Sequence, residues 1–385
     1  MLRVGLERAT AGGLPGLRGA RSGLVTNHSG IDRASRPGPQ LLTCSDTVDL
    51  VAMFAPEHGL RGTAEAGELV ATGIDPTTGL PVHSLYGERR EPDPDDLRSL
   101  DALLFDIQDI GVRYATYAST LVGCMRACAR AGLPLVILDR PNPFGGLSIA
   151  GNLPEPDAMS FVAAIPTPIL HGMTIAEIAR CCRDRFGLDL DLRQVLMTGW
   201  DRASIVHDVD WPWVPPSPNL QTPDALALYP GTCLIEATTL SEGRGTAMPF
   251  QVIGAPWVDP ATLVRELARS AEAPGVAFTE AWFTPESGKH AGTRCGGVRV
   301  HANGAAPRDA LMLGLHLLAV SRRLWPGETS WVVGDDGRPW LDALCAGDQV
   351  RVALDAMVSP GEIVAGWGGD ERRFADARLP WLLYD

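Results

Sequence analysis

Four short runs of apolar residues occur in the first 140 positions, and each run is continuous rather than alternating. They are SGLVTNHSG from Ser22, VDLVAMFAPEHG from Val48, DALLFDIQDIG from Asp101 and LPLVILDRPNP from Leu133. Continuous apolar runs of this length predict strands buried on both faces of a mainly parallel sheet. Helical patterns lie between them, the clearest being ASTLVGCMRACARAG, which ends on Gly132 as a helix commonly does. Strands that alternate with helices indicate a doubly wound α/β domain.

The pattern changes after a break near Gly151, in GNLPEPDAMSF. TIAEIARCCRDRFG predicts a helix with Thr174 as its N-cap and Glu177 completing a capping box. DPATLVRELARSAEAPG and PRDALMLGLHLLAVSRRLWPG predict two more helices, and VAFTEAWFTP and GGVRVHA predict strands. The stretch from Trp211 to Trp257 has the pattern of a loop-rich segment, and a long irregular segment inside a compact domain is usually functional.

These elements predict two domains. Residues 1–150 form an α/β domain that carries the catalytic loops, and residues 151–385 form a smaller α+β domain that contributes to the cleft. A chain of 385 residues fits this division, because single cores seldom grow beyond about 300 residues.

Composition narrows the class of partner. The formal net charge of −13 argues against nucleic acid, because phosphate binding needs a basic surface. Eight cysteines without a C-x-x-C pair favour free, buried thiols in a reducing compartment, with a zinc site as the weaker alternative. The N-terminus shows no apolar signal segment, and no run of about 18 apolar residues occurs. We therefore expect a cytoplasmic protein without membrane contacts.

Each of the four predicted strands ends in polar residues. In open α/β sheets, ligands bind in the crevice outside the carboxyl ends of the strands. The four strand ends therefore predict one polar crevice. In chain order they supply Thr26, Asn27 and His28; Glu57 and His58; Asp106, Gln108 and Asp109; and Asp139, Arg140 and Asn142.

Two of these strand ends offer acids for catalysis. Glu57 follows a predicted strand, so it is either a general acid or a surface loop carboxylate. His58 beside it either orients a substrate or hydrogen-bonds the backbone. Asp106 and Asp109 are a metal or acid/base pair, or else one is catalytic and the other an N-cap. Arg113 follows closely enough to neutralise either acid.

Two further segments combine charges with rigid turns. Asp139 and Arg140 precede two prolines that stiffen the chain, so the pair either binds a polar ligand or braces the loop. SEGRGT places Glu242 and Arg244 among glycines, but it matches neither nucleotide-binding fingerprint. No G-x-S-x-G or H-E-x-x-H motif occurs. These observations favour hydrolysis without a cofactor and without a metal.

The loop-rich segment contains a candidate sugar site. PPSPN ends on Asn219, whose amide either hydrogen-bonds a sugar hydroxyl or caps the next turn. Trp211 and Trp213 lie beside this loop and are either aromatic platforms for a sugar or packing residues.

Taken together, seven blocks of this sequence resemble the NamZ-type exo-β-N-acetylmuramidases. The blocks stand in family order from about Gly23 to Trp257, and the C-terminal third matches more loosely. They are GLVTNHSG, FAPEHGLRG, DIQDIGVRYATYASTL, LDRPNPFGG, HGMTIAEIA, WVPPSPN and YPGTCLIEATTLSEGRGTAMPFQVIGAPW. The chain departs from the family pattern in showing no secretion signal and in having Ala237 where glycine is expected.

The resemblance implies removal of N-acetylmuramic acid from the non-reducing ends of peptidoglycan fragments. It also implies a Rossmann-like N-terminal domain, a smaller C-terminal domain and an active cleft between them. Glu57, in the PEHG block, is then the catalytic residue. The matching blocks supply the residues expected to contact the sugar: Asn27, His58, Arg61, Gln108, Arg113, Tyr117, Asp139, Arg140, Asn142, His171, Asn219 and Arg244.

Glycoside hydrolysis generally uses two carboxyl groups, so a second acid is expected. Asp106, Asp109 and Glu242 are the candidates, and the substrate's own acetamido group is an alternative nucleophile that the second acid would assist. The lactyl group of muramic acid is an anion, which an arginine fork suits. We expect at least one of the arginines in the matching blocks to contact it: Arg61, Arg113, Arg140 or Arg244.

Three other functions compete with this interpretation. A protein of the same fold that binds muropeptides without cleaving them is the first. A metal-dependent hydrolase that uses Asp106, Asp109 and His58 is the second. A cofactor-dependent oxidoreductase or transferase is the third, and the missing glycine fingerprint argues against it.

Overall fold

The computed structural model describes residues 1–385 except residues 13, 15, 66, 206–207, 209 and 270–274. A seven-stranded sheet forms in the order β3-β4-β2-β1-β5-β6-β7, and all of its pairs are parallel except β3 with β4. The strands are β1 Arg21–Thr26, β2 Asp49–Ala55, β3 Gly73–Ile74, β4 Pro81–Ser84, β5 Ala102–Asp106, β6 Leu135–Leu138 and β7 Leu192–Val195. The four predicted strands are confirmed and occupy the centre of this sheet.

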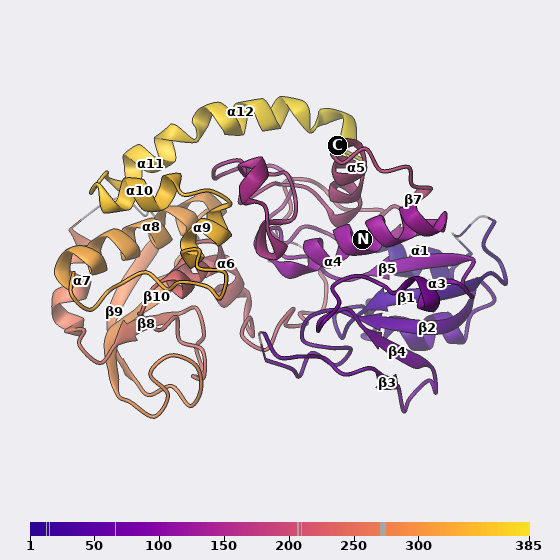
Figure 1. The fold of residues 1–385 in the computed structure, drawn as a ribbon, viewed down its shortest axis with the longest axis horizontal. Helices are drawn as coiled ribbons and strands as arrows, with labels where there is room; N and C mark the ends of the chain where they lie inside the picture. Colours follow the sequence, from indigo (N-terminus) through magenta and orange to yellow (C-terminus); the bar gives the residue numbers. More distant parts are fainter. Residues whose placement is uncertain (13, 15, 66, 206–207, 209, 270–274) are drawn as a thin grey trace.

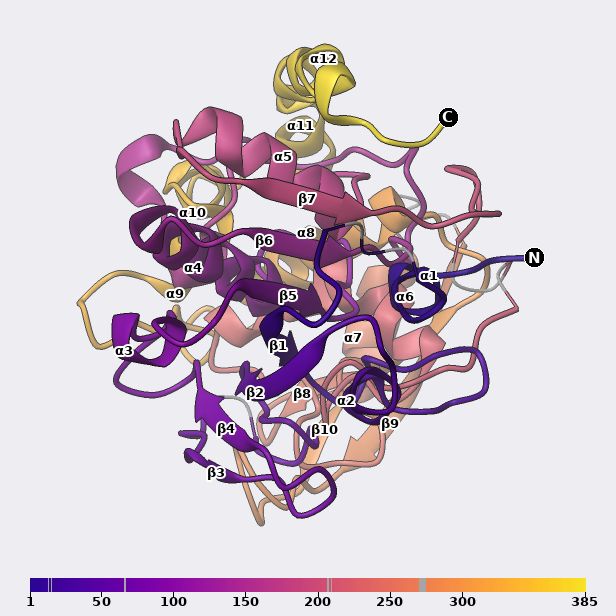
Figure 2. The ribbon, with the colours of Figure 1, turned by 90° about the vertical axis from the view of Figure 1, so that its right-hand side faces the viewer.

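Helices cover both faces of the sheet, as the continuous apolar runs require. Val25 of β1 packs in a core with α4 Thr116–Ala131 and α5 Ile175–Arg185. Its neighbour Leu24 packs on the opposite face with α1 Gly5–Thr10 and α2 Gly38–Thr43. Figure 2 shows α4 on one side of the strands and α1 and α2 on the other. The short helix α3 Pro94–Leu97 precedes β5.

The second part of the chain is built on a three-stranded antiparallel sheet in the order β8-β10-β9. The fold is thus a mainly parallel α/β sheet with a smaller second domain, as predicted, and Figure 1 shows the two parts side by side. The strands are β8 Val252–Ala255, β9 Val276–Phe283 and β10 Cys295–Ala302. The helices are α6 Pro223–Thr232, α7 Pro260–Ala268, α8 Pro307–Leu324, α9 Trp340–Cys345, α10 Gln349–Asp355, α11 Pro360–Gly366 and α12 Gly368–Ala377. Short 3-10 turns occur at η1 Pro156–Ala158, η2 Phe161–Ala163, η3 Cys233–Ala237 and η4 Leu379–Trp381.

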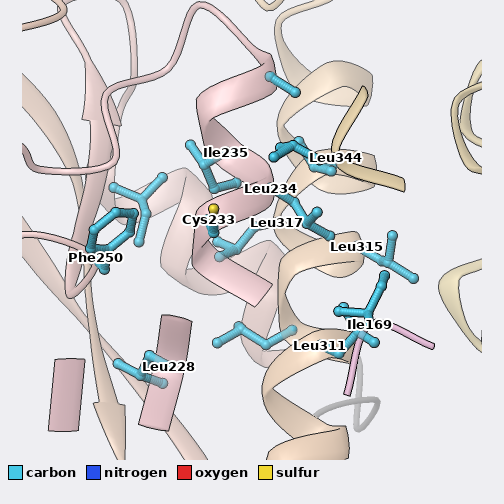
Figure 3. Close-up of a cluster of buried hydrophobic side chains, with 14 of the residues drawn as sticks. Ile169, Leu228, Cys233, Leu234, Ile235, Phe250, Leu311, Leu315, Leu317 and Leu344 are labelled. Carbon is cyan, nitrogen blue, oxygen red and sulfur yellow. The ribbon is translucent and has the colours of Figure 1, made fainter. Parts of the chain in front are cut away.

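The prediction of an irregular segment from Trp211 to Trp257 was wrong in part, because α6, η3 and β8 lie within it. Helix α6 is apolar on all sides and packs against α8 in the core shown in Figure 3. The two backbones touch there, since a Cβ on Gly231 would lie 1.7 Å from the carbonyl oxygen of Ala310. Tertiary packing therefore stabilises a helix whose prolines and glycine resemble a loop in sequence.

The first sheet extends past the predicted boundary at residue 150. Strand β7 comes from residues 192–195, and the C-terminal residues return to the sheet after α12. The hydroxyl of Tyr384 donates to the Asp139 carboxylate at 2.5 Å, and Leu383 N donates to Glu177 at 2.8 Å. The C-terminal residues, which follow the helices of the second part, thus bind to the first part.

Several smaller predictions can be compared with the structure. The capping box of Thr174 and Glu177 is present at the start of α5. All eight cysteines are free, and seven of them are buried, whereas Cys44 is exposed. Within the described residues, no helix is long and apolar enough to cross a bilayer.

Candidate functional site

Glu57 lies two residues after β2 and is only 7% exposed. Its Oε1 accepts a hydrogen bond from the backbone N–H of Gly67 at 3.1 Å. Its Oε2 accepts one from the hydroxyl of Thr116, the first residue of α4. In the described part of the chain, no cation pairs with this carboxylate, so two neutral donors hold it in place. Buried polar groups held in this way keep a fixed orientation.

Two tyrosines lie close to Glu57, and one of them, Tyr117, also neighbours Asn27. Burial, followed by the nearby charge of Glu57, raises the pKa of Tyr86 to about 12. The same two causes raise the pKa of Tyr117 well above its ordinary value, and Asp109 adds to the effect. Asn27, at the end of β1, accepts from the backbone and hydroxyl of Ser29, while its Nδ2 has no partner among the described residues. Three strand ends therefore meet here, as expected.

His58 forms a backbone hydrogen bond with one of its two ring nitrogens. Its φ of +69° places it in the left-handed region, and its Nδ1 lies 2.8 Å from the carbonyl oxygen of Ala64. This contact closes the tight turn that follows Glu57. Of the two alternatives for His58, the structure has the backbone hydrogen bond.

The PPSPN loop contacts His28, which follows β1, and Tyr117 of α4. Nε2 of His28 lies 2.6 Å from the carbonyl oxygen of Pro215, and the hydroxyl of Tyr117 donates to the carbonyl of Pro216. The Asn219 amide donates to the Glu65 carboxylate at 3.1 Å, so it is engaged by a side chain. Burial lowers the pKa of His28, which keeps the ring neutral.

A pocket of about 290 Å³ has Pro216 in its lining. Trp200, Trp211 and Trp213 line it together with Gln108, Asp109, Asn142 and several prolines. Two buried polar atoms of its lining have no partner in the described chain, namely Oδ1 of Asp109 and Nε1 of Trp200. Burial raises the pKa of Asp109 to about 6 although its Oδ2 accepts from Gly111 N at 2.7 Å. The Gln108 amide donates to the carbonyls of Asp109 and Pro141.

Asp106 and Arg140 form a fully buried ion pair, with Nε to Oδ1 at 2.6 Å and Nη2 to Oδ2 at 3.0 Å. Asp139 accepts from Thr174, Ala176 and Tyr384, and burial raises its pKa to about 7. These contacts brace the loop after β6 and the start of α5. The bracing alternative for Asp139 and Arg140 is therefore the one the structure shows.

Three more predicted contact residues occupy structural positions. Arg113 is fully buried and donates to the carbonyls of Asn152, Thr167 and Cys345, and burial lowers its pKa to about 10. His171 is also fully buried; its Nε2 lies 3.9 Å from Asp109, and burial lowers its pKa to about 3.

Asn142 donates to the carbonyl of Met173 at 3.0 Å and accepts from the backbone N–H of Phe144 at 2.8 Å. Although it also lines the tryptophan pocket, both ends of its amide are bound to the protein.

Glu242 and Arg244 belong to a charge cluster in the second domain. Glu242 pairs with Lys289 at 3.0 Å and with Arg244 at 3.3 Å, and Arg244 also pairs with Glu236 at 2.6 Å. Coulombic attraction from these acids raises the pKa of Arg244 despite its burial. Arg61 pairs with Asp75. Thus all four arginines expected at the lactyl group already have partners.

Sequence reasoning missed Tyr86, Thr116 and Lys289. Thr116 was findable, because it opens the helix that follows a polar strand end inside the DIQDIGVRYATY block. Tyr86 and Lys289 reach the site and the charge cluster from loops that no sequence pattern marks.

Comparison with known structures and proteins places this geometry in context. Two crystal structures of DUF1343 family proteins from Bacteroides fragilis share the fold, with TM-scores of 0.89 and 0.78. Each is 30% identical in sequence, and each match covers 100% of this chain and 99% of the other. The peptidoglycan β-N-acetylmuramidase NamZ of Bacillus subtilis (strain 168) is 39% identical over 368 residues, which span 96% of this chain and 88% of that protein.

The family models agree with these likenesses. The model of the N-terminal part of exo-β-N-acetylmuramidase NamZ matches residues 22–224, which include Glu57 and its neighbours. The model of the C-terminal part matches residues 227–384, which include the charge cluster. The two matches together take in nearly the whole chain, and the resemblance of the seven blocks is confirmed. The chain belongs to the exo-β-N-acetylmuramidase NamZ family.

Proposed function

We propose that this protein is a glycosidase that removes N-acetylmuramic acid from the non-reducing ends of peptidoglycan fragments, with Glu57 as its general acid. The observation that carries the role of Glu57 is its setting: a buried carboxyl at the carboxyl edge of the sheet, held by Gly67 N–H and the Thr116 hydroxyl. The Tyr86 hydroxyl lies close enough to interact with the same carboxylate. The family relative from Bacillus subtilis carries the same activity in its name.

Glu57 would protonate the glycosidic oxygen as the bond to the anomeric carbon breaks. A general acid held within hydrogen-bond reach typically contributes about 10²–10⁴ in rate. The two neutral donors fix the plane of the carboxyl without an ion pair, and this orientation is what a proton transfer needs. The tyrosines Tyr86 and Tyr117 lie close to this carboxyl, and both are buried.

Asp109 is our choice for the second carboxyl group. Asp106 forms an ion pair with Arg140, and Glu242 forms ion pairs with Lys289 and Arg244. The charge of each carboxylate is therefore already neutralised by cations of the protein. Asp109 keeps one oxygen without a partner in the described chain and lines the tryptophan pocket. It would stabilise the cationic ring, activate water or assist attack by the acetamido group.

The tryptophan pocket suits a sugar. Trp211 and Trp213 give it flat apolar walls, and sugar rings present apolar C–H faces that pack on indole. The metal-dependent alternative draws no support from the residues named for it. Asp106 is held by a guanidinium and His58 by a carbonyl, and the described residues contain no cluster of three metal-ligating side chains.

The experiment is release of nitrophenol from para-nitrophenyl N-acetylmuramide, with the N-acetylglucosaminide as the substrate control. Wild-type protein should cleave the muramide only, and Glu57→Gln should be slower on it. Binding of muramic acid without cleavage by wild-type protein would replace the proposal with a non-catalytic sugar-binding protein. Equal rates for wild type and Glu57→Gln on the unactivated disaccharide of N-acetylmuramic acid β-linked to N-acetylglucosamine would assign the general acid to another residue.

A further inference from the structure

The lactyl carboxylate of muramic acid needs a cation that is not already bound to the protein. The four arginines in the family blocks do not meet this need. Arg61 and Arg140 are paired with aspartates, Arg244 with glutamates, and Arg113 with backbone carbonyls. The formal net charge of −13 increases this need, because the protein as a whole repels an anionic substrate.

Arg90 is a cation held in place without an acidic partner. Its guanidinium carbon lies 4.0 Å from the ring centre of Phe161 and 4.7 Å from that of Tyr86. Planar guanidinium groups stack on aromatic rings and keep their N–H donors at the edge of the plane. Of the acids close in sequence, Glu91 pairs with Arg130 and Asp93 with Arg89, while Glu88 lines the same groove as Arg90 without forming an ion pair with it among the described residues. Among the described residues, no carboxylate pairs with Arg90.

The rings that hold Arg90 are tied to the element that holds Glu57. In the first turn of α4, Thr116 donates to Glu57 and Ser119 donates to the carbonyl of Phe161. Residues three apart lie on one face of a helix, separated by about 4.5 Å along its axis. Phe161 is therefore anchored about one helical turn from the Glu57 contact. The Tyr86 ring lies 5.9 Å from that of Phe161 and is itself a neighbour of Glu57.

Arg90, Ser119 and Phe161 also line a common open groove of about 880 Å³. The guanidinium is exposed on this groove, so an entering ligand can reach it. The groove thus contains Arg90 and Ser119, which lies three residues after the Thr116 contact, and Tyr86 interacts with both Arg90 and Glu57.

We propose that Arg90 binds the lactyl carboxylate of N-acetylmuramic acid and so selects muramides over glucosaminides at the Glu57 site. This inference rests on the proposed function. The lactyl ether is on C3, two ring atoms from the anomeric carbon, so its carboxylate must be bound within about one sugar ring of the acid. A stacked guanidinium presents two parallel N–H groups to a carboxylate and is already ordered before binding.

The test compares Arg90→Gln and Arg90→Lys with the neighbouring Arg89→Gln as the matched control. The substrates are para-nitrophenyl N-acetylmuramide and its lactamide, in which the carboxylate is a neutral amide. Arg90→Gln should lower kcat/KM on the acid by roughly 10- to 100-fold, the range for a hydrogen bond to a charged group. It should leave the lactamide unchanged. Arg90→Lys should fall between, because it keeps the charge but loses the fork.

Equal kcat/KM for Arg90→Gln and Arg89→Gln on both substrates would overturn the inference while leaving the proposed function intact. An equal loss on the acid and the lactamide would also overturn it, because the effect would not depend on the carboxylate. If wild-type protein cleaved no muramide, the proposed function would fail by itself. Calorimetric binding of N-acetylmuramic acid would then decide on Arg90: loss of binding in Arg90→Gln supports the inference, and unchanged binding refutes it.

Discussion

Replacing Arg140 with methionine should destabilise the fold strongly, because its buried guanidinium is bound to groups of the protein. The guanidinium is 1% exposed and makes two contacts with Asp106, which is 0% exposed, and a third with the carbonyl of Ile31 at 3.0 Å. The substitution leaves the Asp106 carboxylate buried without a partner. Breaking a buried pair in this way costs about 3–5 kcal/mol in the free energy of unfolding.

The measurement is urea-induced unfolding of wild type, Arg140→Met, Asp106→Asn and the double variant. The double variant should lose much less stability than the two single variants combined, since it contains no unpaired buried charge. Unchanged stability of Arg140→Met together with a raised KM would refute the reasoning and would indicate that Arg140 binds substrate.

Three further predictions concern the site and the core. Burial raises the pKa of Asp109 to about 6 from an ordinary value of 3.8, so ionisation opposes folding and wild-type stability should fall as the pH rises from about 4 to 6. Asp109→Asn has no charge to bury, so its free energy of unfolding should rise by on the order of 2–3 kcal/mol relative to wild type across that pH range, while its kcat drops. Urea titrations at several pH values measure the difference, and parallel stability curves would contradict the assignment. Gly231→Ala places a Cβ against an α8 carbonyl and should cost about 1–3 kcal/mol or more, whereas the control Gly361→Ala meets no atom within 4 Å and should be neutral or slightly stabilising; equal thermal midpoints for the two variants would refute the close crossing. Thr116→Val removes the hydroxyl that orients Glu57 and should lower kcat about tenfold with little change in the thermal midpoint; an unchanged kcat would show that this hydrogen bond has no part in the reaction.

The centre of the fold was predictable because its strands are buried on both faces, which leaves an unbroken apolar run in the sequence. Strand β7 was missed because it lies at the sheet edge and reads LRQV, with polar residues in the middle. Helix α6 was missed because Pro223, Pro230 and Gly231 are turn residues in most settings. Its helical state comes from packing against α8, which is remote in sequence.

The position of the candidate acid was predictable, but the partners of the charged residues were not. A glutamate directly after a buried strand belongs to the ligand-binding edge of an α/β sheet, and that rule located Glu57. Whether an arginine is free to bind a ligand depends on which group, often remote in sequence, contacts it in the fold. Arg113 reaches a carbonyl 232 positions away at Cys345, and Arg140 meets an acid 34 positions earlier. Arg90 stacks on Phe161, and nothing in the sequence between them indicates that contact.

In the proposed reaction, Glu57 donates the proton to the leaving group. The direct test is to compare Glu57→Gln with wild type on two substrates, the unactivated disaccharide of N-acetylmuramic acid β-linked to N-acetylglucosamine and the aryl muramide. A nitrophenolate leaves without much help from an acid, whereas a sugar alkoxide does not. We predict that Glu57→Gln, which keeps an acceptor for the Gly67 N–H, loses about 10²–10⁴ in kcat on the disaccharide and distinctly less on the aryl muramide. Equal losses on both substrates, or no loss on the disaccharide, would contradict the role of Glu57 as the acid.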